Sequence, residues 1–297
     1  MLPVKELKDN LFRPWFLMFW AFKLALRTIG RLIAAGDFAT LFSPSALFDA
    51  CFANFWGLLS PGFKDDMAPV VRPLYEGRLH DGKVVDKPVH PPVSGVVLEL
   101  GAGNGSWIKE FAEIGNINTT GSDDKLRKRG GTGKPTISKI YAVEPVLQSV
   151  EVLRERIQEA GMEHVYEVVP VGVESINDPS KWDGKIEPES LDCIVTVFCL
   201  CSIPEPEKNI AALYALLKPG GRWYVYEHVR CHRSVFWIAI YQRLIEFPWK
   251  YLVGCGLANP AGPQLLNAGK WSHVDLGSPD EETPYEVIPH IGGVLTK

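Results

Sequence analysis

A short apolar strand that runs directly into a glycine-rich turn is the feature that most constrains how this chain can fold. Residues 96–100 read Val-Val-Leu-Glu-Leu, and residues 101–105 read Gly-Ala-Gly-Asn-Gly before a predicted helix over residues 106–114. Glycines let a backbone approach a ligand closely, and in open α/β sheets the ligand lies at the carboxyl ends of the strands. The segment therefore predicts a ligand-binding strand–turn–helix unit.

The alternation of strands and helices continues beyond this unit. Further strands are expected over residues 139–143, 165–169, 191–198 and 222–229, with helices over residues 146–160 and 205–217. Strands separated by helices imply right-handed crossovers and a mostly parallel sheet with helices on both faces. The predicted fold class is therefore α/β, with a doubly wound sheet.

The first 60 residues differ in character from the rest of the chain. They hold 12 of the 32 aromatic residues and a charge of +2, whereas the whole chain carries −4. Lys23, Arg27 and Arg31 are spaced four apart, so on a helix from Trp15 to Ala35 they form one cationic stripe beside a wide aromatic surface. This pattern is typical of a helix that lies in a membrane interface. The alternative is a helix that packs on the protein's own core with a solvated Lys/Arg edge.

Other functions of this N-terminal segment are disfavoured. No run of about 18 uncharged apolar residues occurs, and the segment lacks a convincing signal-peptide cleavage site. A net charge of −4 excludes an obvious nucleic-acid binder. We therefore expect a membrane-surface contact and no nucleic-acid partner.

We predict two regions. Residues 1–92 form an N-terminal helical segment and linker, and residues 93–297 form the ligand-binding domain, with a flexible insertion over 115–138. Within the first region, one helix over 46–59 is expected to stop at Ser60-Pro61-Gly62, a second occupies 64–80, and the Pro-containing stretch 81–92 is a linker. An apolar helix over 234–253, broken near Pro248, is predicted as a substrate lid.

The six cysteines include no Cys-x-x-Cys pair, and none stands at zinc-finger spacing from a histidine. The sequence therefore predicts reduced thiols of an intracellular protein and no metal site.

Acidic residues follow two further strands. Glu144, followed by Pro145, ends the second strand, where a carboxylate can accept hydrogen bonds from both hydroxyls of a ribose. Val173-Glu174 follows the third strand, where a carboxylate can meet an adenine amino group. The alternative is a set of turn glycines with solvated carboxylates. The spacing G-x-G-x-G differs from the dinucleotide fingerprint G-x-G-x-x-G, which disfavours a NAD-dependent reductase.

Together with Leu-Leu-Lys-Pro-Gly-Gly at residues 216–221, these motifs resemble class I S-adenosylmethionine-dependent methyltransferases over residues 96–229. The resemblance implies a seven-stranded sheet that closes with strands near 271–276 and 286–296, the last of them antiparallel. It also implies S-adenosylmethionine as cofactor. The predicted cofactor-binding residues are Glu99, Gly101, Ala102, Gly103, Asn104, Glu144, Pro145, Val173, Glu174, Phe198 and Cys199.

A narrower resemblance rests on Phe198–Ile203, Glu227-His228-Val229, Phe247–Lys250, Gly254-Cys255 and Pro289-His290-Ile291. These segments are similar to the methyltransferase-like 7 group of thiol S-methyltransferases. That similarity implies a membrane-associated enzyme with a hydrophobic N-terminal anchor, at the endoplasmic reticulum or lipid-droplet surface, and a small lipophilic acceptor.

The acceptor class decides whether a catalytic base is required. A thiol of pKa about 8.5 is partly ionised near neutral pH, whereas a hydroxyl of pKa near 10 requires a general base. His228, with Glu227 beside it, is the predicted catalytic pair, although either side chain can instead be structural. The favoured function is thiol methylation; the alternatives are an O- or C-methyltransferase of a phenolic or quinone-like metabolite, and a non-catalytic, membrane-tethered S-adenosylmethionine-binding protein.

Overall fold

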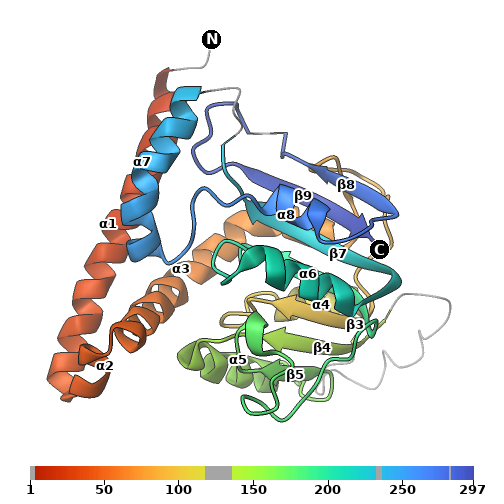
Figure 1. Ribbon diagram of the computed structural model, residues 1–297, viewed down its shortest axis with the longest axis horizontal. Coiled ribbons are helices and arrows are strands. Elements are labelled where there is room, and N and C mark those ends of the chain that lie inside the picture. The colour runs from red at the N-terminus through yellow and green to blue at the C-terminus, as the bar shows by residue number, and fades with distance from the viewer. Residues whose placement is uncertain (1–3, 118–135, 232–235, 281) are drawn as a thin grey trace.

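A mostly parallel seven-stranded sheet forms the centre of the protein (Figure 1). The computed structural model describes residues 4–117, 136–231, 236–280 and 282–297. The strands, in their order across the sheet, are β5 (Tyr166–Val169), β4 (Ile137–Val143), β3 (Gly95–Leu100), β6 (Leu191–Val197), β7 (Leu217–His228), β9 (His290–Thr296) and β8 (His273–Gly277). Strands β3 to β7 pair in parallel, and β9 pairs antiparallel with both β7 and β8. The predicted sheet and both closing strands are confirmed.

Helices cover both faces of the sheet because successive side chains of a strand point to opposite faces. In β3, Val97 joins the core on one face and Leu98 the core on the other. The first core is completed by α4 (Ile108–Ile114) and α5 (Leu147–Glu159), and the second by α6 (Pro206–Leu216) and α8 (Ala261–Asn267). A 3₁₀ turn, η2 (Val173–Ser175), follows β5.

A separate group of long helices stands beside the sheet (Figure 1). It contains α1 (Val4–Ala35), the short α2 (Phe38–Phe42), α3 (Pro44–Tyr75) and α7 (Phe236–Val253). Met18 and Leu24 of α1 pack with Phe55 of α3 and with Ile245 and Trp249 of α7 in a third core cluster. Helix α1 therefore has an inner face that is buried within the protein. Among the described residues, no helix is both long and apolar enough to cross a bilayer.

Two predicted helix breaks are wrong. Helix α3 continues through Pro61, and α7 continues through Pro248. A proline removes one backbone donor and bends a helix, but the turns beyond it persist where packing holds them. In α3, Val71 and Leu74 are fully buried in the sheet core and fix the second half of the helix.

The predicted linker over residues 81–92 contains part of a hairpin. Residues 79–84 form a hairpin of β1 (Leu79–His80) and β2 (Lys83–Val84), because Asp81 and Gly82 both adopt the positive φ angles of a tight turn. Strand β7 begins at Leu217, five residues before the predicted strand. Of the predicted flexible insertion over 115–138, residues 118–135 lie outside the described residues.

Candidate active site

The glycine turn after β3 is held against the end of β4. The amides of Gly101 and Ala102 donate to the carbonyl oxygen of Val143 at 2.9 and 3.1 Å. Gly101 has a φ of +70°, and a Cβ there would lie 2.6 Å from Cβ of Cys199. The position therefore requires glycine, and Cys199 borders the turn as predicted.

Glu144 fastens the same turn to the start of α5. Its Oε2 accepts a hydrogen bond from the Gly103 amide and its Oε1 from the Val146 amide, both at 2.9 Å. Burial raises the pKa of this carboxyl group, and the two backbone donors act in the opposite direction. A carboxylate has about four lone-pair sites, so two remain for ligand hydroxyls. The predicted ribose-binding residue is thus placed and oriented beside the glycine turn.

Beneath the turn, Glu99 carries a buried carboxyl group. Considering the described residues, its Oε2 has no hydrogen-bond partner. Burial, together with the charges of Glu144 and Glu110, raises the pKa of Glu99 to about 8. No sequence motif indicates Glu110, whose carboxylate forms an ion pair with Lys64 of α3 at 3.1 Å. A cationic ligand beside Glu99 would favour the ionised form of this carboxyl group.

The loop after β6 borders the site from the other side. Phe198 has a φ of +55°, which is unusual for a bulky residue and often marks a functional position. Its amide donates to the Tyr226 carbonyl at 3.0 Å, and its ring meets the edge of Phe63 at 4.7 Å between centroids. The predicted lining residue Phe198 is therefore held in one strained conformation.

Glu227 of β7 holds the two residues that follow. Its Oε1 accepts from the amides of Cys199 and Leu200 at 3.1 and 3.2 Å, and from Cys199 Sγ at 3.4 Å. The side chain is completely buried, and this burial raises the pKa of Glu227 to about 7 although the hydrogen bonds lower it. Glu227 positions the loop, and its predicted catalytic role stays a prediction.

His228 lies in a cluster with two cysteines. Its Nε2 is 3.6 Å from Sγ of Cys255, and Cys201 Sγ belongs to the same group. In the sequence, both cysteines belong only to segments that are similar to the methyltransferase-like 7 group. The catalytic role predicted for His228 also stays a prediction.

The remaining predicted residues occupy the expected strand ends. Val173 is buried and Glu174 exposed in η2 after β5, and Pro145 is exposed after β4. Asn104 is half-buried, and its carbonyl accepts a hydrogen bond from Arg156 at 2.8 Å. The adenine-binding role of Val173 and Glu174 remains a prediction.

Helix α3 covers the glycine turn. No sequence pattern predicts this contact. Ser60 Oγ lies 2.7 Å from Ser106 Oγ, and a Cβ at Gly57 would lie 3.4 Å from Nδ2 of the Asn104 side chain. The N-terminal region therefore contributes directly to the cofactor side of the sheet.

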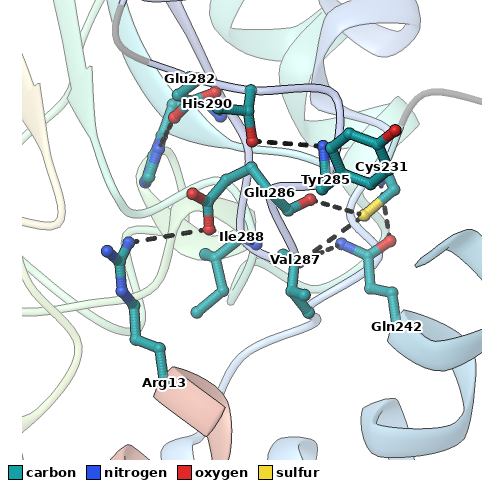
Figure 2. A network of polar contacts seen from close by, with 10 residues as sticks. Arg13, Cys231, Gln242, Glu282, Tyr285, Glu286, Val287, Ile288 and His290 are labelled. Carbon is teal, nitrogen blue, oxygen red and sulfur yellow. Dashed lines mark hydrogen bonds and ion pairs between the residues drawn. The ribbon is translucent and has the colours of Figure 1, made fainter. Parts of the chain in front are cut away.

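A buried polar network attaches α7 to the chain around it (Figure 2). The Gln242 amide accepts from the Cys231 amide at 2.9 Å and donates to the Val287 carbonyl at 3.0 Å. Arg13 of α1 forms an ion pair with Glu286 at 3.7 Å in the same network. Gln242 thus joins the predicted lid to the segments that carry Cys231 and Val287, and Arg13 joins α1 to the second of these segments.

The methyltransferase domain family model matches residues 83–253, more than half of the chain. The chain belongs to this family. The match confirms the predicted family and its cofactor, S-adenosylmethionine.

Curated relatives cover part of the same region. The chain is 30% identical to thiol S-methyltransferase TMT1A of Homo sapiens over 110 residues, which cover 36% of this chain and 44% of the relative. It is 28% identical to the ubiquinone/menaquinone biosynthesis C-methyltransferase UbiE of Escherichia fergusonii over 131 residues, covering 44% and 41%. The chain spans less than half the length of the curated relatives it matches.

A solved structure shares the fold. A putative O-methyltransferase from Nostoc punctiforme aligns with a TM-score of 0.51 and 16% identity, over 83% of this chain and 60% of that one. The likeness confirms the predicted fold class.

The residues at the glycine turn fit S-adenosylmethionine, which carries a positive sulfonium and an ammonium group. Gly101 allows the turn to pass directly beside Cys199, Glu144 retains acceptor sites for the ribose, and Glu99 offers a buried carboxyl group for a cation. The donor set therefore suits this cofactor.

Replacing Glu144 is expected to weaken cofactor binding. A hydrogen bond to a charged group contributes about 1.5–3 kcal/mol, so Glu144→Ala should raise the Kd for S-adenosylmethionine at least tenfold in calorimetry. The exposed Glu151→Gln on α5 is the control and should bind like the wild type. An unchanged Kd for Glu144→Ala would contradict the ribose assignment.

Glu99 is expected to make the ligand-free protein less stable as pH rises. Its pKa is raised from 4.5 in an exposed chain to about 8 in the fold, so between these values the folded state holds the proton more tightly. Stability therefore falls through this interval as pH increases. Thermal unfolding should show a higher Tm at pH 5.5 than at pH 8, with a smaller difference in Glu99→Gln.

Glu227, with a pKa of about 7, acts in the same direction and leaves a residual slope in the Glu99→Gln variant. Glu151→Gln should retain the full slope of the wild type. Equal slopes in the wild type and Glu99→Gln would show that Glu99 ionises normally.

Proposed function

We propose that this chain transfers the methyl group of S-adenosylmethionine to the sulfur of a small lipophilic thiol at an intracellular membrane surface. The observation that carries the proposal is the union of a methyltransferase sheet with two adjoining helices, α1 and α7, whose outer faces are aromatic. Relatives named as thiol S-methyltransferases support the choice of a thiol.

Methyl transfer requires that the nucleophile be aligned with the methyl group more than it requires acid–base catalysis. S-adenosylmethionine supplies a methyl group that is already activated by its positive sulfur. The protein has to hold the nucleophile in line and exclude water. Phe198, packed against Phe63 and Tyr226, provides a rigid aromatic border for this purpose. A thiol near neutral pH supplies its own thiolate fraction.

A second candidate function is supported by Glu227. A buried carboxyl group with a pKa of about 7 suits a general base, which a phenolic or quinone-like acceptor requires. In the described part of the chain its Oε2 has no hydrogen-bond partner. The relative named as a ubiquinone/menaquinone C-methyltransferase supports the same alternative.

Exposed aromatic and aliphatic residues support the membrane-surface part of the proposal. On α1, Phe16 and Phe19 are 62% and 56% exposed, and on α7, Leu244 and Phe247 are 70% and 73% exposed. The exposed α7 residues Phe236, Ile240, Leu244, Phe247 and Tyr251 recur at helical spacing. Large exposed apolar surfaces mark membrane or protein contacts.

Exposed cations accompany these aromatic residues on α1. Lys23, Arg27 and Arg31 are all exposed, and the Lys23 ammonium lies 5.1 Å from the Trp20 ring centroid. Basic residues beside an apolar face attract anionic lipid headgroups. We therefore favour an anionic bilayer surface as the partner.

The acceptor class is tested with a matched pair of compounds that differ in one atom. We expect the full chain with S-adenosylmethionine to methylate 4-butylbenzenethiol and to leave 4-butylphenol unmodified, as measured by mass spectrometry. Glu227→Gln should retain activity on the thiol, since a thiolate needs no base. Methylation of the phenol alone, lost in Glu227→Gln, would establish the second candidate; cofactor binding with no product from either would favour the non-catalytic alternative.

Membrane contact is tested by co-sedimentation with phosphatidylcholine/phosphatidylserine vesicles. The double substitution Phe16→Ser and Phe247→Ser removes two exposed side chains and should reduce the bound fraction several-fold, because each buries apolar surface in the interface. Leu147→Ser removes a residue 65% exposed on α5 and serves as the matched control. Equal binding of all three proteins would contradict the proposed contact face.

A further inference from the structure

Three residues from distant parts of the chain converge at the end of β7. Cys201 lies in the loop after β6, His228 is the last residue of β7, and Cys255 lies in the turn after α7. Their Sγ and Nε2 atoms belong to a group whose members all lie within 4.8 Å of one another. We propose that Cys201, His228 and Cys255 bind one zinc ion.

The spacing of the ligand atoms fits a tetrahedral zinc site. With Zn–S of about 2.3 Å and Zn–N of about 2.0–2.1 Å, an Sγ and an imidazole nitrogen on one zinc ion lie about 3.6 Å apart. The distance from Cys255 Sγ to His228 Nε2 is 3.6 Å. This pair therefore already stands at the separation that coordination requires.

The chemistry of the three side chains selects the metal. Two thiolates and one imidazole form a soft ligand set, which favours zinc over the oxygen-preferring calcium and magnesium ions. Two thiolates also balance the charge of a divalent zinc ion. Because His228 and Cys255 are 5% and 6% exposed, a bound zinc ion would supply the charge partner that a thiolate buried there requires.

Surrounding hydrogen bonds hold two of the ligands. Trp249 Nε1 donates to Cys255 Sγ at 3.1 Å, an interaction that supports a thiolate. The Gly256 amide donates to the Cys201 carbonyl at 2.9 Å and joins the two cysteine-bearing loops. The site is thus built by packing and backbone contacts that do not depend on the metal.

The site replaces the sequence-based expectation of no metal. That expectation came from the spacing of cysteines and histidines along the sequence. In this cluster, successive ligands stand 27 residues apart instead of the two to five typical of zinc fingers. Catalytic zinc sites with three protein ligands keep a fourth position for water or substrate. Cys201 is only half-buried, which agrees with an open position on its side of the cluster.

The fourth position would suit the thiol acceptor of the proposed function, on which this role depends. A thiol entering it would release its proton to solvent and bind as the thiolate. Cys199, two residues from Cys201, borders Gly101 of the glycine turn, so the cluster belongs to the same end of the sheet as the cofactor site.

The metal site is tested on the full chain without any methyl-transfer assay. We expect about one zinc ion per chain by mass spectrometry of the desalted protein. Exchange with Co²⁺ alone should produce the near-ultraviolet charge-transfer absorption of cobalt bound to thiolate. Cys201→Ser and Cys255→Ser should each lower zinc affinity by more than about tenfold, whereas Cys51→Ser on α3 should bind as the wild type does.

Two controls keep the outcome decisive. Calorimetry with S-adenosylmethionine reports whether each variant is folded, and a wild-type protein that gives neither zinc nor the cobalt absorption overturns the site without any variant. A Cys201–Cys255 disulfide in the freshly isolated protein, or equal loss of zinc in Cys51→Ser, would also overturn it. Adding ethanethiol to the cobalt-loaded protein should strengthen the charge-transfer absorption; an unchanged spectrum would refute the open fourth position.

Discussion

One buried carboxylate oxygen, Oε1 of Glu227, determines the shape of the site. It accepts hydrogen bonds from the amides of Cys199 and Leu200 and ties the loop after β6 to the neighbouring strand β7. Without this acceptor, two backbone donors would be buried at the strand end, which costs free energy. The bonded loop in turn places Cys199 against Gly101 and orients the chain that continues to Cys201.

Acidic and basic side chains gather in different parts of the protein. Acidic side chains gather beneath the glycine turn, where burial and the nearby Glu144 and Glu110 raise the pKa of Glu99, and the cofactor predicted there is cationic. Basic side chains gather instead on the exposed surface of α1. A single chain with a net charge of −4 thus places acidic groups at the cofactor site and basic groups on the surface of α1 proposed to contact lipid.

Sequence patterns predicted the features that depend on local order. The strand ends that carry Gly101, Glu144 and Phe198 follow from alternation of apolar strands and helices, since parallel strands bring their carboxyl ends to one edge. Features that depend on tertiary packing were missed. The continuation of α3 through Pro61 depends on Val71 and Leu74 reaching the sheet core, which no local signal reports.

The Cys201–His228–Cys255 cluster was missed for a related reason. Its ligands lie on three segments, and Cys255 reaches His228 only because the chain turns back toward the sheet after α7 ends at Val253. The spacing of a sequence motif can indicate a site within one short segment. This cluster depends instead on how the loop after β6, the end of β7 and the turn after α7 are arranged in space. By contrast, Glu144 could be recognised because its partner Gly103 lies at the end of the adjacent strand.

Gln242 on the inner face of α7 has a consequence for engineering. Its amide is bonded to Cys231 and to the carbonyls of Val229, Leu257 and Val287, so this one buried side chain joins the helix to three other segments. The outer residues of α7, such as Leu244 and Phe247, take no part in this anchorage. Substitutions on the outer face, for instance ones that remove the proposed lipid contact, are therefore expected to leave the position of α7 against the sheet unchanged.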